Sequence, residues 1–310
     1  MYELGILKSY EFGVKIISVG NTSMGGSGKT PLVLWLAKAL IGKGLKVGIV
    51  EKGYRSKLSK KDIVLGEKGK DKINESLIGD EAAMIWNKVT DGVRLCVSHD
   101  KTAGTASLEQ RWRDLDAVIV DDAFQHLKLK RDVDVVLIDS MSGFKDRMFP
   151  YGRLRESYSS LKRANVLLFT KADALSKTDR EYLLEKALKI NSKLKVFFSI
   201  TELYTSVDVK GKKVLPVSAI YNPMHFNDKL RAAGAVFEKY AAYADHYSFG
   251  KKDVDHIIKV KESAGAEYIV VTSKDIPKLK EFFKGRNDII EAWYEHKIDD
   301  QEGFLRCCIG

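Results

Sequence analysis

Hydrophobic positions along the chain fall into short runs rich in β-branched residues, which alternate with longer amphipathic stretches. Short runs that are apolar throughout, separated by helical patterns, predict a parallel sheet with helices on both faces. Helical patterns appear at 31–41 and 80–89. In the first two thirds of the chain the predicted strands are 14–19, 47–50, 117–120, 133–138, 166–169 and 196–200.

A polar stretch at residues 201–213 interrupts this alternation, and a second α/β pattern follows it. We therefore predict two α/β domains, a larger one over residues 1–205 and a smaller one over residues 206–310. The elements expected in the smaller domain are strands at 214–217, 268–272 and 289–293 and helices at 226–240, 254–263 and 277–283.

The composition is that of a folded globular protein. The chain has 310 residues, of which 45% are hydrophobic and 30% charged, with five prolines and three cysteines. This excludes a disulfide miniprotein, a collagen and a disordered chain. No apolar run approaches the roughly 18 to 20 residues of a membrane-spanning helix, and the N-terminus lacks a secretion-signal pattern. We expect a soluble or peripheral intracellular protein.

Positive charge is in excess and unevenly spread. The 52 Lys and Arg against 42 Asp and Glu give a formal net charge of +10. Eight basic residues against three acidic ones fall within residues 52–72. Such an excess favours a phosphorylated ligand, an acidic membrane surface or a nucleic acid as partner, although a solvated loop has the same composition.

The strongest local signal is GNTSMGGSGKT over residues 20–30, between a predicted strand and a predicted helix. Its glycines allow successive backbone amides to point inward around phosphate oxygens, and the helix N-terminus adds its positive dipole end. Lys29 can reach the β- and γ-phosphates, and the Thr30 hydroxyl can ligate magnesium. The sequence therefore predicts a nucleoside triphosphate site. Its nucleotide-binding residues are Asn21, Thr22, Gly25, Gly26, Ser27, Gly28, Lys29 and Thr30.

Two further features bear on the class of nucleotide-binding protein. The strand at 117–120 runs directly into Asp121 and Asp122, as a buried strand that delivers a carboxylate to magnesium should. The stretch TKAD at 170–173 is similar to the base-reading motif of GTPases. A switch GTPase usually has a glycine where Phe124 stands, which weakens that interpretation.

More polar motifs lie outside the nucleotide-binding loop. Each has a simple structural explanation in isolation. Asp80, for example, could be a helix cap and nothing more. Taken together and in order, they make the chain similar to the tetraacyldisaccharide 4'-kinase family of lipid A biosynthesis over about residues 5–280. The motifs that carry the resemblance are SVGN (18–21), GGSGKTP (25–31), GY (53–54), GDE (79–81), DDAFQH (121–126), GRLRE (152–156), SAIYNP (218–223), DH (245–246) and TSKD (272–275).

The chain departs from the family pattern at several positions. The usual GYG followed by a basic residue reads GYRSK at 53–57. Ala82 and Ser157 replace the prolines that usually follow GDE and LRE, and Ala219 replaces a usual glycine. None of these changes removes a group that does chemistry.

The resemblance implies a P-loop NTPase-type fold and transfer of the ATP γ-phosphate to the 4'-hydroxyl of a tetraacylated glucosamine disaccharide 1-phosphate. It implies that Asp80 is the catalytic base, acting with an Asp245–His246 dyad, and that Lys29 neutralises the transferring phosphoryl group. Mg²⁺ would be held by Thr30, Glu81, Asp121 and Asp122. The implied substrate-binding residues are Tyr54, His126, Arg153 and Arg155.

The implied partner is the acylated disaccharide lipid, met at the cytoplasmic face of the inner membrane by a peripheral protein. Membrane contact would come from an N-terminal helix, as in the family, or from the basic segment 52–72. We expect no nucleic-acid partner and no obligate protein partner. Two alternatives stay open. One is a MinD-like or metallochaperone-type NTPase switch, favoured by Gly25-Gly26 and by TKAD at 170–173. The other is a nucleic-acid-binding protein, favoured by net charge alone.

Overall fold

The computed structural model describes residues 8–53, 62–66, 75–89, 92–245 and 247–310. Its backbone contacts divide the chain into two compact units. The first comprises Met1–Thr201 and His296–Gly310, and the second comprises Glu202–Glu295. Each unit is an α/β assembly with its own buried cores.

The first unit is built on a largely parallel sheet in which only β3, at the edge, is antiparallel to its neighbour. The order of its strands is β8-β7-β6-β1-β5-β2-β4-β3. The strands are β1 (Lys15–Asn21), β2 (Val47–Glu51), β3 (Ile63–Leu65), β4 (Val93–Val97), β5 (Ala117–Asp121), β6 (Val133–Asp139), β7 (Val166–Thr170) and β8 (Lys195–Thr205), whose last residues enter the second unit.

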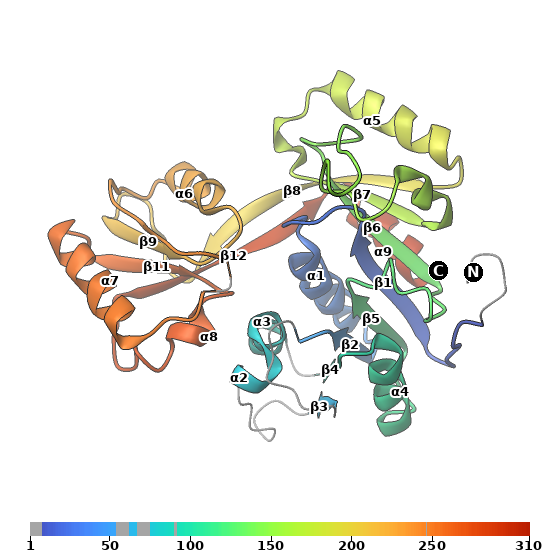
Figure 1. Ribbon diagram of the computed structural model, residues 1–310, viewed down its shortest axis with the longest axis horizontal. Helices are drawn as coiled ribbons and strands as arrows, with labels where there is room; N and C mark the ends of the chain where they lie inside the picture. The colour runs from blue at the N-terminus through green and yellow to red at the C-terminus, as the bar shows by residue number, and fades with distance from the viewer. Residues whose placement is uncertain (1–7, 54–61, 67–74, 90–91, 246) are drawn as a thin grey trace. The chain divides into compact units, whose positions relative to one another are not determined.

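Helices cover both faces of this sheet (Figure 1). Alternate strand residues such as Ile17 and Ile119 pack with Leu36 of α1, Ile85 of α3 and Phe304 of α9. Their neighbours in sequence face the opposite way, toward α4 or toward α5. The helices are α1 (Lys29–Gly42), α2 (Glu75–Ile78), α3 (Asp80–Lys88), α4 (Lys101–Arg111), α5 (Lys177–Ile190) and α9 (Gln301–Ile309), with the 3-10 helices η1 (Tyr158–Arg163) and η2 (Ala172–Ala174). The predicted fold class is confirmed.

The second unit has a short parallel sheet of order β10-β9-β11-β12. Two apolar clusters, one containing Leu215 and Ile257 and the other Phe226 and Val270, form its core. Its elements are β9 (Val214–Ser218), α6 (Pro223–Ala232), β10 (Ala241–Ala242), α7 (Lys251–Ser263), β11 (Tyr268–Thr272), α8 (Ile276–Leu279) and β12 (Ile289–Ile298).

The predicted smaller domain, residues 206–310, differs from this unit at its C-terminal end. The chain returns to the first unit within β12, at His296, and α9 follows. Phe304 of α9 is fully buried and packs edge-on against Trp35 and Phe197, with ring centroids 5.6 and 5.4 Å away. The apolar side chains of α9 therefore complete the core of the larger unit, a pairing that no local pattern indicates.

Some element predictions are also corrected. The polar stretch that we predicted to begin at residue 201 instead continues β8 to Thr205. The predicted helix 226–240 ends at Ala232, because Gly234 adopts a φ of 86° just beyond it. The pattern alone missed α4, whose small polar residues form little of an apolar stripe and whose N-terminus is capped by the Asp100 side chain.

Within the described residues, every helix is too short or too polar to cross a membrane.

Candidate active site

The glycine-rich loop lies between the end of β1 at Asn21 and the start of α1 at Lys29. Two hydrogen bonds fix its base: the Asn21 side-chain amide donates to Ser27 Oγ over 2.8 Å, and the Gln125 amide donates to the Asn21 carbonyl oxygen over 2.8 Å. Gly28 precedes the helix with a φ of 85°, which side chains rarely tolerate. The predicted nucleotide-binding residues therefore occupy one strand–loop–helix segment.

A second loop, residues 147–155, runs alongside the first. Met24 N donates to the Arg153 carbonyl oxygen over 2.7 Å, and Arg155 N donates to the Thr22 carbonyl oxygen over 2.8 Å. Ser23 and Leu154 form an isolated antiparallel bridge between these contacts. The arginine-bearing motif 152–156 is thereby brought next to the glycine-rich loop, which lies about 130 residues earlier in the sequence.

Positive side chains converge on Asp122, which follows β5. Lys29 Nζ lies 3.4 Å from Asp122 Oδ1, and Arg155 Nη1 donates to both carboxylate oxygens over 3.0 and 2.9 Å. The Lys101 ammonium donates to the Asp122 carbonyl oxygen. Burial by itself would raise the pKa of Asp122, but these three cations outweigh it and the pKa is lowered. Asp122 is therefore an anion held by cations.

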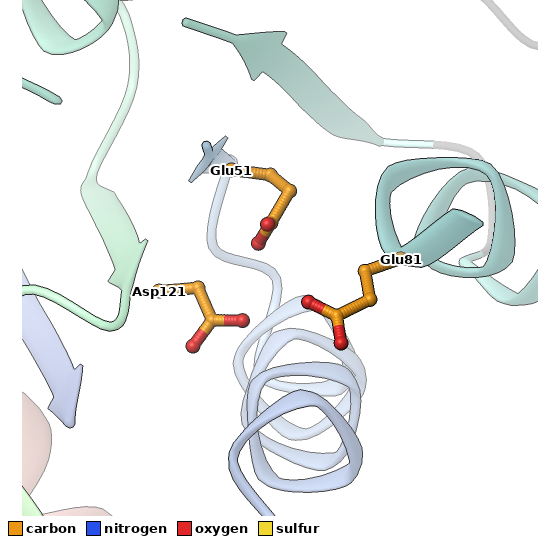
Figure 2. Close-up of side chains that lie close together, drawn as sticks. All are labelled: Glu51, Glu81 and Asp121. Atoms are coloured by element: carbon orange, nitrogen blue, oxygen red, sulfur yellow. The ribbon is translucent and has the colours of Figure 1, made fainter. Parts of the chain in front are cut away.

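Three carboxylates meet beside the start of α1 (Figure 2). Oxygens of Glu51, Glu81 and Asp121 all lie within 4.8 Å of one another. Burial, reinforced by the neighbouring carboxylates, raises the pKa of Glu51 well above its usual range. Burial likewise raises the pKa of Asp121 to about 6. The cluster is a set of hard oxygen donors of the kind that Mg²⁺ prefers.

The sheet explains this convergence. Adjacent parallel strands β2 and β5 pair Val50 with Val120, so the next residues, Glu51 and Asp121, end the two strands side by side. Ile49 and Ile119, two residues earlier, face α1 and α3, and alternation puts the two carboxylates on that same face. Glu51 belongs to this carboxylate cluster, and our prediction did not include it. The sequence did carry a signal for Glu51: a carboxylate at the end of a buried strand, the same feature that indicated Asp121.

Asp80 is the first residue of α3, directly before Glu81 of the carboxylate cluster. Gly79 precedes it with a φ of 87° and a ψ of 161°, a backbone conformation that favours glycine. This turn starts the helix so that Asp80 and Glu81 occupy its first turn, where the helix dipole stabilises negative charge.

The predicted substrate-binding residues are spread over this edge of the first unit. His126 Nε2 lies 3.0 Å from Thr102 Oγ1 and 3.6 Å from Asp100, and burial lowers the pKa of its ring. Arg153 Nε donates to Asp146 over 3.0 Å, and about half of the arginine side chain is exposed. Tyr54 lies outside the described residues, as does most of the basic segment 52–72.

The motifs of the second unit assemble around Asp275, which is fully buried. Its Oδ2 accepts from Thr272 Oγ1 over 2.7 Å and from Ala219 N over 2.8 Å, and Lys278 lies 3.1 Å from Oδ1. Asp245 Oδ1 lies 3.2 Å from Lys274 Nζ. Three motifs, at 218–223, at 245 and at 272–275, are thus brought together. His246 lies outside the described residues.

The motif TKAD at 170–173 begins at Thr170, the last residue of β7 in the first unit. Lys171 Nζ donates to Asp139 Oδ2 over 2.5 Å, so this lysine is bound by the neighbouring strand β6. The pairing accounts for the lysine as a structural feature of the strand end.

Comparisons with known proteins converge on one family. The sequence model of the tetraacyldisaccharide-1-P 4'-kinases (LpxK) matches residues 1–305. The tetraacyldisaccharide 4'-kinase of Psychrobacter cryohalolentis is 34% identical over 293 residues, which cover 90% of this chain and 75% of the relative. That of Halothermothrix orenii is 30% identical, covering 96% and 81%.

A solved structure is similar over nearly the whole chain. LpxK from Aquifex aeolicus, crystallised in complex with ATP, superposes with a TM-score of 0.77 and 26% sequence identity. The similarity covers 99% of this chain and 91% of that protein. These matches favour a kinase over the NTPase-switch alternative.

Proposed function

The chain belongs to the tetraacyldisaccharide-1-P 4'-kinase family, and we propose that the loop 20–30 and the acidic edge beside it carry out its phosphoryl transfer. The reaction moves the γ-phosphate of ATP to the 4'-hydroxyl of a tetraacylated glucosamine disaccharide 1-phosphate, a step of lipid A biosynthesis. The observation that carries the assignment is the convergence of Lys29 and Arg155 on Asp122, next to the glycine-rich loop.

The loop binds the triphosphate of ATP through its backbone amides and the start of α1. Lys29 Nζ lies 3.4 Å from Asp122, and in this proposal its ammonium would pair with the β- and γ-phosphates of ATP. Arg155 lies beside Lys29 on the same carboxylate, so it adds positive charge where the phosphoryl group is transferred. Both cations stabilise the charge that spreads over the transferring group.

The residues at the sheet edge fit a divalent cation. Glu81 and Asp121 supply carboxylates, the Thr30 hydroxyl follows Lys29 on α1, and a buried carboxylate oxygen of Glu51 lacks a hydrogen-bond partner among the described residues. Bound Mg²⁺ would supply charge neutralisation for the phosphate oxygens. Asp122, held by Lys29 and Arg155, acts in this proposal mainly as their counter-ion.

Asp80 accepts the proton of the acceptor hydroxyl. Its place at the start of α3, one residue from Glu81, supports this role, because the base must lie near the transferring phosphoryl group. Asp245 and His246 of the second unit are proposed to assist it as a dyad.

The acceptor is an anionic lipid, and basic and aromatic groups suit it. We assign Arg153 to its phosphate because the guanidinium is about half exposed and can form paired hydrogen bonds with phosphate oxygens. His126, with Tyr54 from the segment outside the described residues, lines the sugar site in this proposal.

A peripheral position at the cytoplasmic face of the inner membrane is also part of the proposal. The net charge of +10 favours anionic lipid surfaces. The loop beside the glycine-rich loop exposes Met148 by 44%, Phe149 by 66% and Tyr151 by 88%. Apolar side chains next to Arg147 and Arg153 are a combination that suits the interface of a bilayer.

A label-transfer assay tests the function. Wild-type protein is given ATP carrying radiolabelled γ-phosphate and detergent-dispersed tetraacyl disaccharide 1-phosphate, with labelled GTP run in parallel. Label on the lipid from ATP is expected, and Lys29→Ala should abolish it. Label released only as free phosphate by folded, nucleotide-binding protein would contradict the proposal and favour an NTPase switch.

A further inference from the structure

Glu51 is the member of the carboxylate cluster that the proposed reaction does not use. It ends β2, and its oxygens are directed into the space that it shares with Glu81 and Asp121 (Figure 2). One oxygen from each of the three residues lies within 4.8 Å of the others. Two neighbouring strands and one helix hold these groups, so the cluster is built by the core of the first unit.

The second observation is an unsatisfied buried atom. Glu51 is only 3% exposed, and its Oε2 is buried without a hydrogen-bond partner among the described residues. Buried polar atoms nearly always have a partner, because leaving one without a partner destabilises the fold, and more so when the group is charged. An acceptor of this kind, aimed into a group of other carboxylates, calls for a proton or a positive ligand.

The nearby cations do not fill this role. The Lys101 ammonium donates to the carbonyl oxygen of Asp122, and Lys29 Nζ lies beside the Asp122 carboxylate. Within the described part of the chain, neither lysine donates a hydrogen bond to Glu51 Oε2. A divalent cation fits because it can accept oxygens from all three carboxylates at once.

We propose that Glu51 joins Glu81 and Asp121 in a three-carboxylate site that binds Mg²⁺ before the nucleotide arrives. The inference rests on the proposed function, in which the same cation serves phosphoryl transfer. It adds Glu51 as a ligand and places metal binding before nucleotide binding. Two carboxylates and a hydroxyl leave half of the six positions around Mg²⁺ to nucleotide and water, whereas a third protein carboxylate makes binding without nucleotide favourable.

Metal binding by the nucleotide-free, full-length protein tests this inference. The probe is Mn²⁺, an oxygen-preferring divalent cation whose free form is counted by its electron paramagnetic resonance signal. Wild-type protein should bind Mn²⁺ without nucleotide, and Mg²⁺ should displace it. Glu51→Gln should weaken Mn²⁺ binding by about tenfold or more. Glu181→Gln, an exposed glutamate on α5, is the matched control and should bind as wild type does.

Thermal unfolding separates a ligand from a structural residue. Without metal, Glu51→Gln should unfold at or above the wild-type temperature, because it removes a carboxyl from an acidic cluster. Added Mg²⁺ should raise the unfolding temperature of wild type and of the control, and should raise that of Glu51→Gln by less at the same Mg²⁺ concentration. Glu51→Asp, which retracts the carboxylate by one methylene, should weaken Mn²⁺ binding as well and serves if Glu51→Gln does not fold.

The outcomes are separable from those of the kinase assay. If wild type binds no Mn²⁺ without nucleotide, or if Glu51→Gln binds it as tightly as wild type, the inference is overturned even when label reaches the lipid. If label never reaches the lipid although Mn²⁺ binds as expected, the proposed function fails and the metal site stands.

Discussion

His296 Nε2 lies 2.9 Å from the carbonyl oxygen of Gly28, so β12 holds the loop from which α1 begins. A carbonyl oxygen only accepts, and Nε2 must therefore carry the hydrogen and donate. Nδ1 then accepts from Ser199 Oγ, 3.1 Å away. Burial lowers the pKa of His296, which keeps the ring neutral, although the bond to Gly28 opposes this. His296 directly follows Glu295, the last residue of the second unit.

Replacement of His296 should therefore disturb ATP binding through the loop. In His296→Leu the Gly28 carbonyl oxygen keeps the Leu32 N–H but loses the histidine donor, at a cost of about 0.5–1.5 kcal/mol. We expect the KM for ATP to rise about 2–10-fold, with a smaller change in kcat. His296→Gln keeps an amide donor and should recover part of the loss. Steady-state kinetics on both variants check this, and an unchanged KM in His296→Leu would show that the bond does not position the loop.

The same histidine predicts a dependence of stability on pH. Its pKa in the folded protein lies below the ordinary value of 6.5, so the unfolded chain takes up a proton first as the pH falls. Unfolding is then favoured progressively below about pH 6.5, and there is no contribution above it. Urea denaturation of wild type and His296→Gln at pH 7.5 and 5.5 measures the effect. The wild type should lose more stability between these pH values, and equal losses would contradict the prediction.

Asp80→Asn should remove the base without altering the nucleotide loop. We expect kcat to fall by about 10²–10⁴-fold, the usual contribution of a positioned general base. The Kd for ATP, measured by titration calorimetry, should stay within about twofold of wild type, because the loop 20–30 and the start of α1 bind the triphosphate in this proposal. A twofold change in Kd corresponds to only a few tenths of a kcal/mol. Asp255→Asn, at an exposed aspartate on α7, is the control. Near-normal kcat in Asp80→Asn would exclude Asp80 as the base.

Asp275 should govern the stability of the second unit. In Asp275→Ala the buried Ala219 N–H and the Lys278 ammonium lose their acceptor, which should cost about 3–5 kcal/mol. Hydrogen exchange followed by mass spectrometry can resolve the units. Protection should fall in peptides from residues 202–295, and peptides from β1 and β5 should keep theirs. Unchanged protection in the second unit would show that Asp275 is not needed for its fold.

The linear pattern was enough to predict the alternating α/β architecture, the strand–loop–helix that contains Lys29 and the carboxylates at the end of β5. These features are local: an apolar run, a set of glycines and the residue at a strand end lie within about a dozen positions of one another. Family motifs added Asp80, Glu81, Arg153 and Arg155 as site residues, although their contacts could not be derived from their order.

What required the folded chain are the partners that come from distant segments. Glu51 reaches the site only because β2 lies beside β5, and the register of these parallel strands is set by the packed core. His296 reaches Gly28 across 268 positions because the chain returns from the second unit within β12. Such contacts depend on which strands become neighbours, and that choice is made by burial of the whole apolar surface rather than by any local sequence signal.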